Sequence, residues 1–113
     1  MLTIDGLREF GANVDEGVTR CAGKEELYLK LVGRIPSDKG FEALPEAISN
    51  KDLDGAFEYA HGLKGVLANL SLTPILEPVE RITESLRSRT DRDYSEDLAL
   101  MAEAKKKLDE LCA

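Results

Sequence analysis

The residue with the clearest chemical potential in this chain is His61, the only histidine among its 113 residues. It lies in a segment, 52–72, whose apolar residues recur at spacings of three and four, as on a helix that packs against other helices. These apolar residues are Leu53, Ala56, Ala60, Leu63, Leu67 and Leu70. At about 100° per residue, His61 falls roughly 120° from the middle of that apolar face. We therefore predict that its imidazole faces the solvent.

Two residues on the next turn, Lys64 and Gly65, share the side of the helix on which His61 lies. The ammonium group of Lys64 can reach an anion held at the imidazole. A glycine inside a helix costs about 1 kcal/mol relative to alanine. Something other than helix stability therefore favours Gly65, and the simplest reason is clearance for a bulky group or a docking surface. Without such neighbours, one histidine on a helix is more often an ordinary surface or boundary residue.

The segment Ala60-His61-Gly62-Leu63-Lys64-Gly65 resembles the AHxLKG signature of histidine-containing phosphotransfer (HPt) domains, the relay proteins of multistep two-component signalling. The resemblance covers roughly positions 10 to 112, with similar runs at 14–18, 23–29, 68–70 and 76–86. Ala68 and Ser71 stand where many members of that family carry glycine. Both residues are small, so these departures concern packing around the end of the helix more than the phosphoryl site.

The resemblance implies a phosphorelay intermediate. His61 would accept a phosphoryl group from a receiver-domain aspartate of a hybrid sensor kinase and pass it to the aspartate of a response regulator. Lys64 would help to stabilise the phosphoryl charge, and Gly65 would give access. Mg²⁺ would come with the partner receiver domain, so the chain would need no cofactor of its own. The alternative is a non-catalytic helical-bundle adaptor that binds signalling partners.

Docking of a receiver needs a surface as well as a nucleophile. The family resemblance implies packing on apolar residues around the histidine, commonly with the short N-terminal helix. We therefore expect Phe57, Ala68 and Leu7 to contact the partner. Phe57 is equally consistent with the boundary of the core.

Composition excludes several other classes of function. A net charge of −7 and a pI near 4.7 argue against a nucleic-acid-binding surface, which needs basic patches. The sequence has no Gly-rich phosphate loop, and 113 helical residues leave no room for a kinase ATP domain, so we expect a phosphoryl carrier without kinase activity. With one histidine and no DxDxDG-like loop, we expect no metal site. A Ser/His/Asp triad would need a pocket and an oxyanion hole, which an exposed histidine in mid-helix lacks.

The chain has no signal-peptide pattern at its start and no apolar stretch near the ~20 residues that span a bilayer. We therefore expect a cytoplasmic protein without membrane contact. Cys21 and Cys112 lie far apart with no CxxC motif, which favours reduced structural thiols but leaves a disulfide open. Met1 and the end at Ala113 favour a free-standing protein, and the apolar residues needed for the core leave a monomer as the default.

The elements that must position the site all have helical periods, and the shortage of alternating β-branched residues argues against strands. We predict one domain, 1–113, with an all-α fold. Short N-terminal capping helices (1–22) would precede an antiparallel up-down-up-down four-helix bundle (24–112), with 24–50 counted as one interrupted helix. From Lys24, the apolar residues Leu27, Leu31 and Ile35, with Tyr28 and Val32 beside them, predict a helix of three turns that ends before Pro36. Predicted N-caps are Asp52 for the central helix, Thr73 followed by Pro74 for the next, and Ser95 for the last.

Overall fold

The computed structural model describes residues 1–113 in full, and it is all-helical with no strand. Its elements are α1 (Ile4–Phe10), α2 (Val14–Arg20), α3 (Glu25–Val32), the 3₁₀-helix η1 (Ile35–Ser37), α4 (Gly40–Ser49), α5 (Leu53–Asn69), α6 (Thr73–Arg87) and α7 (Ser95–Cys112). The predicted fold class, all-α, is therefore confirmed. No helix is long and apolar enough to cross a membrane.

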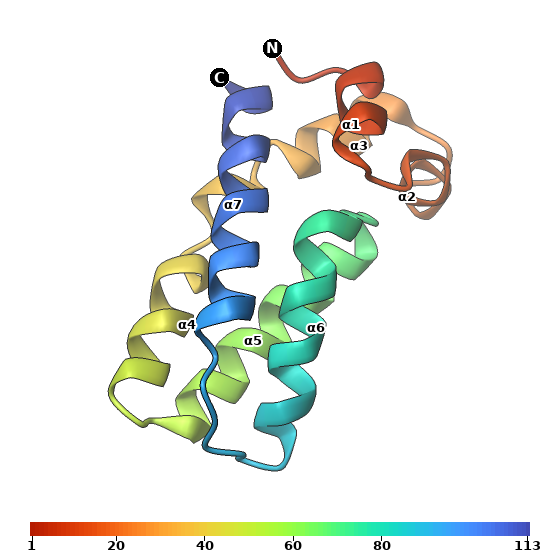
Figure 1. Cartoon of the computed structure of the whole chain (residues 1–113). Helices are drawn as coiled ribbons and strands as arrows, with labels where there is room; N and C mark the ends of the chain where they lie inside the picture. The colour runs from red at the N-terminus through yellow and green to blue at the C-terminus, as the bar shows by residue number, and fades with distance from the viewer.

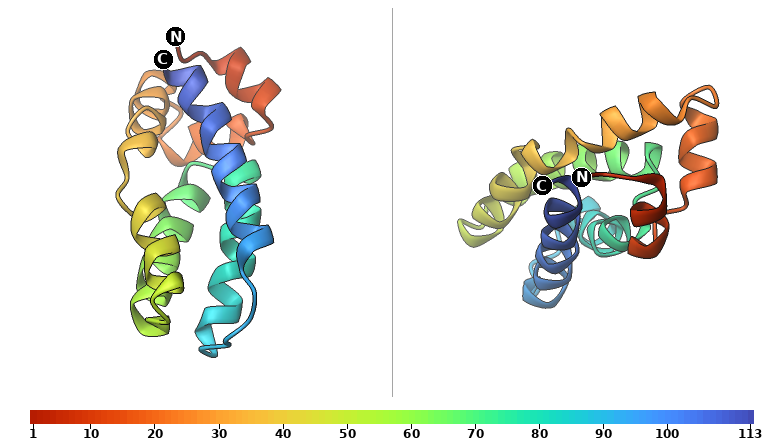
Figure 2. Two further views of the ribbon diagram at one scale, coloured as in Figure 1. Left: turned by 60° about the vertical axis from the view of Figure 1, so that its left-hand side comes forward. Right: turned by 90° about the horizontal axis from the view of Figure 1, so that it is seen from above.

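The four longer helices, α4 to α7, pack in sequential order. Each contacts the next one along the chain, and Figures 1 and 2 show the chain reversing direction between one helix and its successor. The connections from α4 to α5 and from α5 to α6 are short, which favours antiparallel neighbours. The seam predicted for α5 is buried except for Leu53, which is half-buried. In α6, the apolar residues that recur at spacings of three and four, Ile75, Val79, Ile82 and Leu86, are fully buried.

The three short helices α1 to α3 gather at the end of the molecule where α5 gives way to α6 (Figure 1). Three hydrogen bonds fasten them there. The Tyr28 hydroxyl donates to the Leu70 carbonyl at 2.8 Å, the Asn13 amide donates to the Ser71 carbonyl at 2.9 Å, and the Arg20 guanidinium donates to the Ala68 carbonyl. Burial raises the pKa of Tyr28 to about 12, with a smaller contribution from Cys21. The N-terminal segment therefore packs against the C-terminal end of the helix that carries His61.

The predicted first bundle helix differs most from the structure. α3 ends at Val32, and η1 separates it from α4, so 24–50 forms two distinct helices joined by a 3₁₀ turn. Tyr28 and Val32 are fully buried, whereas Leu27 is 39% exposed and Leu31 is half-buried. The apolar residues of α3 occupy more than half of its circumference, so packing against α2 and α5, rather than the sequence period, selects the buried side.

Helix caps agree with the sequence in one of three cases. The Asp52 side chain accepts a hydrogen bond from the Gly55 amide at 3.0 Å and caps α5 as predicted. Thr73 is already the first residue of α6, and its hydroxyl points back to the Ser71 carbonyl. Ser95 likewise begins α7, and Asp93 accepts from its amide at 2.9 Å. Ser and Thr suit several positions around a helix start, which explains these one-residue errors.

Cys21 is buried and Cys112 is half-buried, and the two thiols are not joined in a disulfide. The Met1 amino group donates to the Ala113 carbonyl at 2.8 Å, so the first and last residues lie side by side (Figure 1).

Candidate functional site

His61 lies on α5, exposed to solvent, with the buried seam of the helix on its other side. Its neighbours Ala60 and Leu63 are buried, because they belong to that seam. The helix period therefore places the imidazole on the outer face, as the sequence predicts. An imidazole held on a packed helix has a fixed backbone position and free access from solvent, which suits a nucleophile that must meet a second protein.

The ring of Phe57, one turn before His61, stacks on the imidazole. The ring centroids are 5.6 Å apart and the planes differ by 24°. Two arginines lie over the same phenyl ring, Arg89 at 4.6 Å and Arg87 at 5.5 Å from its centroid. Such cation–π contacts attract the guanidinium to the electron-rich ring face. Phe57 therefore links the histidine on α5 to basic side chains at and just beyond the end of α6.

Lys64 is held by a residue of the neighbouring helix. Its ammonium nitrogen lies 3.8 Å from the Glu84 carboxylate, and its side chain is 29% exposed. The same carboxylate oxygen lies 3.4 Å from a guanidinium nitrogen of Arg87. Two cations thus share one carboxylate beside the face that carries His61.

Gly65 leaves an opening next to the imidazole. A Cβ built at Gly65 would meet no atom within 4 Å, and the same holds at Gly62. Gly65 also lines a groove of about 520 Å³ between α5 and the α3–η1 segment. Its lining residues are Leu31, Arg34, Ile35, Asp38, Gly65, Val66, Asn69 and Leu70. The glycine is therefore not required by packing inside the protein, and it borders a partly apolar hollow one turn from His61.

The three residues predicted for docking have different environments. Phe57 is half-buried beside His61, and Ala68 is half-buried two turns further along the same face. Leu7 is fully buried in the core. Its side chain offers no surface to a partner, so the choice of Leu7 was wrong. The amphipathic pattern of α1 turns its most central leucine inward, against the rest of the protein.

Sequence reasoning missed the contribution of α6 and the loop after it. Glu84, Arg87 and Arg89 reach the His61 face from outside α5, and Arg89 also forms an ion pair with Asp54 at 2.6 Å. The only signal in the sequence is that these residues lie on the polar side of α6 or just after it. The packing of α6 against α5 decides which residues these three side chains contact. The helix period alone does not predict that packing.

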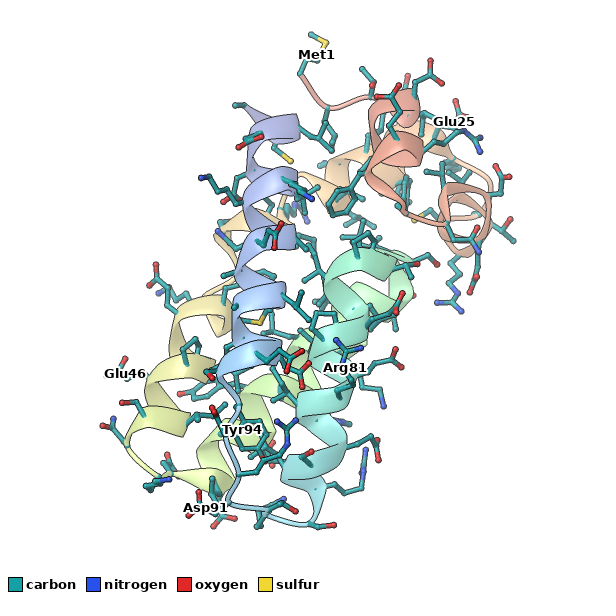
Figure 3. The ribbon with its side chains drawn as sticks, in the orientation of Figure 1. Met1, Glu25, Glu46, Arg81, Asp91 and Tyr94 are labelled. Atoms are coloured by element: carbon teal, nitrogen blue, oxygen red, sulfur yellow. The ribbon has the colours of Figure 1, made fainter.

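A wider hollow of about 870 Å³ lies between α6 and α7 and has only polar lining residues. Arg81 and Arg92, which line it, bind the two carboxylate oxygens of Asp97 at 2.9 and 3.0 Å. Figure 3 shows Arg81 on α6 beside the start of α7, and Tyr94 on the connecting segment. Burial acts to raise the pKa of Asp97, but the hydrogen bonds from Arg81 and Arg92 outweigh it and leave that pKa below its ordinary value. These arginines are engaged in fastening the loop between α6 and α7 and do not form a free anion site.

Comparison with known protein families adds a direct finding. The family model of the Hpt domain matches residues 36–113, more than half of the chain, and that range contains His61, Lys64, Gly65 and all of α4 to α7. The chain therefore belongs to the Hpt domain family. Hpt domains act in histidine phosphotransfer within two-component phosphorelays and interact with receiver domains. No curated protein and no solved structure matches the chain.

Proposed function

We propose that this protein is a phosphorelay intermediate that carries a phosphoryl group on His61, between a receiver-domain aspartate of a hybrid sensor kinase and the aspartate of a response regulator. The observation that carries the proposal is the exposed imidazole of His61 within the matched Hpt region, flanked by Lys64 and the opening at Gly65. We propose further that α4 to α7 form the up-down-up-down bundle that holds this face rigid, and that the protein works as a cytoplasmic monomer.

The nucleophile that this chain would supply is the imidazole of His61. In a neutral imidazole, one ring nitrogen carries a free lone pair and is a competent nucleophile. The lone pair of that nitrogen forms the N–P bond while the P–O bond of the acyl phosphate breaks, and the electron pair of that bond returns to the aspartate carboxylate. The reverse sequence transfers the group to a second receiver. The phosphoryl group is exchanged between two proteins, and no net oxidation or hydrolysis occurs.

Lys64 and Gly65 have distinct roles in this proposal. The Lys64 ammonium would neutralise part of the charge on the phosphoryl oxygens, which is the main way in which proteins assist phosphoryl transfer. Gly65 would let the receiver bring its acyl phosphate up to the imidazole. Mg²⁺ would be supplied with the receiver domain. No group of three or more His, Cys, Asp or Glu side chains in this chain is arranged to hold a metal ion.

Docking would use the surface around His61. The groove beside Gly65 exposes apolar area from Leu31 and Val66, and Phe57 and Ala68 extend that surface along α5. A receiver domain is the partner that the family membership favours, and apolar contact around the reacting group excludes water from the acyl phosphate. Charged residues at the rim would orient the partner more than they would strengthen binding.

The test is direct phosphoryl transfer. The protein is incubated with Mg²⁺ and a radiolabelled phosphorylated receiver domain, and we expect label on this chain in an acid-labile, base-stable form. The His61→Gln variant should accept none while keeping the wild-type circular dichroism spectrum. Absence of label from several receivers, with the protein shown to be folded, would contradict the relay and favour the adaptor. Label that persists in His61→Gln would contradict the assignment of the nucleophile.

A further inference from the structure

The carboxylate of Glu84 pairs with two of the three cations of the His61 face, Lys64 and Arg87, whereas the third, Arg89, pairs with Asp54. The Glu84 carboxylate lies 3.8 Å from the Lys64 ammonium and 3.4 Å from the Arg87 guanidinium, and its own side chain is 62% exposed. Lys64 lies three residues after His61, so the two side chains are neighbours on the helix surface. Arg87 lies over the Phe57 ring that stacks on the imidazole. Glu84 therefore acts on groups that surround the proposed phosphoryl site without contacting the imidazole itself.

We infer that Glu84 is a positioning residue with a competitive role, an inference that rests on the proposed phosphotransfer at His61. In the unmodified protein, Glu84 holds Lys64 and Arg87 at the edge of the site. A phosphoryl group on His61 brings a charge of about −1.5 to −2 and three strong acceptor oxygens. It then competes with Glu84 for the same cations, and it is also repelled by the carboxylate. Glu84 thereby lowers the stability of the phosphohistidine and favours transfer onward to a receiver.

The remaining arginines around Glu84 are paired with other carboxylates, so they do not offset its competition with the phosphoryl group. Arg89 is paired with Asp54 at 2.6 Å, and Arg81 and Arg92 are bound to Asp97. Lys64 and Arg87 are therefore the cations near His61 whose only carboxylate partner in the structure is Glu84. Lys64 or Arg87 must leave Glu84 in order to turn to the phosphoryl group.

The experiment measures the phosphotransfer equilibrium. One phosphorylated receiver domain is mixed with wild-type protein or with Glu84→Gln, which keeps the size and hydrogen-bonding capacity of the side chain but removes its charge. We expect the equilibrium ratio of phosphorylated protein to phosphorylated receiver to rise roughly twofold to fivefold in Glu84→Gln, the scale of an exposed ion pair. The difference should shrink as the salt concentration rises, because the interacting charges are exposed. A purely structural role of Glu84 would give no such salt dependence.

Two further variants make the result specific. Glu103→Gln changes the net charge equally and breaks an exposed pair with Lys107 on α7, so it should leave the ratio unchanged. In a Lys64→Gln background, the effect of Glu84→Gln should be smaller than in the wild-type background, because one of the two shared cations is gone. A ratio in Glu84→Gln that equals wild type, or that shifts toward the receiver, overturns the inference while leaving phosphotransfer intact. Failure of the wild type to accept label would instead overturn the proposed function.

Discussion

The phenyl ring of Phe57 and the imidazole of His61 form a stacked pair, with centroids 5.6 Å apart and planes inclined by 24°. The pair is built from residues i and i+4 of α5, which lie one above the other on a helix. Because the imidazole is otherwise exposed to solvent, this stack is the main contact that restrains its orientation. A restrained ring matters for in-line transfer, which depends on the direction of the attacking nitrogen.

Replacement of Phe57 should therefore affect transfer more than stability. Phe57→Leu keeps much of the apolar volume and removes the aromatic stack, so we expect the transfer rate to fall about tenfold, as an imperfectly oriented nucleophile does. The free energy of unfolding should fall by only about 1 kcal/mol, the scale of an aromatic pair and a cation–π contact together. Rapid-quench transfer kinetics and urea denaturation measure the two effects. A wild-type rate in Phe57→Leu would show that the stack does not orient the nucleophile.

Gly65 and Gly62 provide a matched pair, because a Cβ at either position meets open space. Gly65→Leu and Gly62→Leu should each stabilise α5 by about 0.5–1 kcal/mol, since glycine is a poor helix former. Gly65→Leu should slow transfer at least about tenfold, because the new side chain obstructs the approach to His61. Gly62 points about a quarter of a turn around the helix from His61. Gly62→Leu should therefore transfer the phosphoryl group at close to the wild-type rate. Equal rates for both variants would contradict a role of Gly65 in access.

Ser71 combines an unfavourable backbone conformation with a buried hydroxyl that has no hydrogen-bond partner. Its φ of 54° lies in the left-handed region that favours glycine, and its buried hydroxyl has no hydrogen-bond partner. Ser71→Gly should therefore raise the free energy of unfolding by about 1 kcal/mol, since relief of strain and of the buried hydroxyl exceeds the added entropy of the unfolded chain. Ser71→Ala removes only the hydroxyl and should gain less. A destabilised Ser71→Gly protein, measured by urea unfolding, would refute this reading.

The ion pairs of Asp97 with Arg81 and Arg92 should make the free energy of unfolding depend on pH. Because the pKa of Asp97 is lowered in the folded state, its contribution is present above the unfolded-state pKa of about 3.9 and is lost as the pH falls below that value. Asp97→Asn should cost about 1–2 kcal/mol at pH 7, where it leaves Arg81 and Arg92 without their carboxylate. The difference in the free energy of unfolding between the wild type and Asp97→Asn should disappear near pH 2. Denaturation at both pH values tests this.

An exposed pair supplies the control for the Asp97 prediction. Asp91 bonds Lys51 at 2.8 Å, with both side chains more than half exposed. Asp91→Asn should change the free energy of unfolding by less than about 0.5 kcal/mol at either pH, because exposed ion pairs contribute little. If Asp91→Asn lowered the free energy of unfolding as much as Asp97→Asn does, net charge rather than the ion pairs of Asp97 would explain the pH dependence.

The features that follow from the helix period can be predicted from the amino-acid sequence alone. The apolar residues of α5 and α6 recur at spacings that leave one stripe on each helix. Burial of the α5 stripe leaves His61 and Gly65 exposed and Lys64 half-buried on another side of the helix. The cap at Asp52 was also predictable, because its carboxylate satisfies free amides of its own helix and needs no distant partner. These are local properties of a single segment.

The groups from other elements that surround the histidine depend on how the helices pack against one another. Glu84 and Arg87 reach the site because α6 packs against α5 in one particular register, and Leu7 is buried because α1 packs against the rest of the protein. In α3, several sides of the helix are apolar, so the hydrogen bond of the Tyr28 hydroxyl to the Leu70 carbonyl, just after α5, helps to select the buried face and leaves Leu27 exposed. Contacts between distant segments depend on packing and loop geometry, which leave no periodic signal in the sequence.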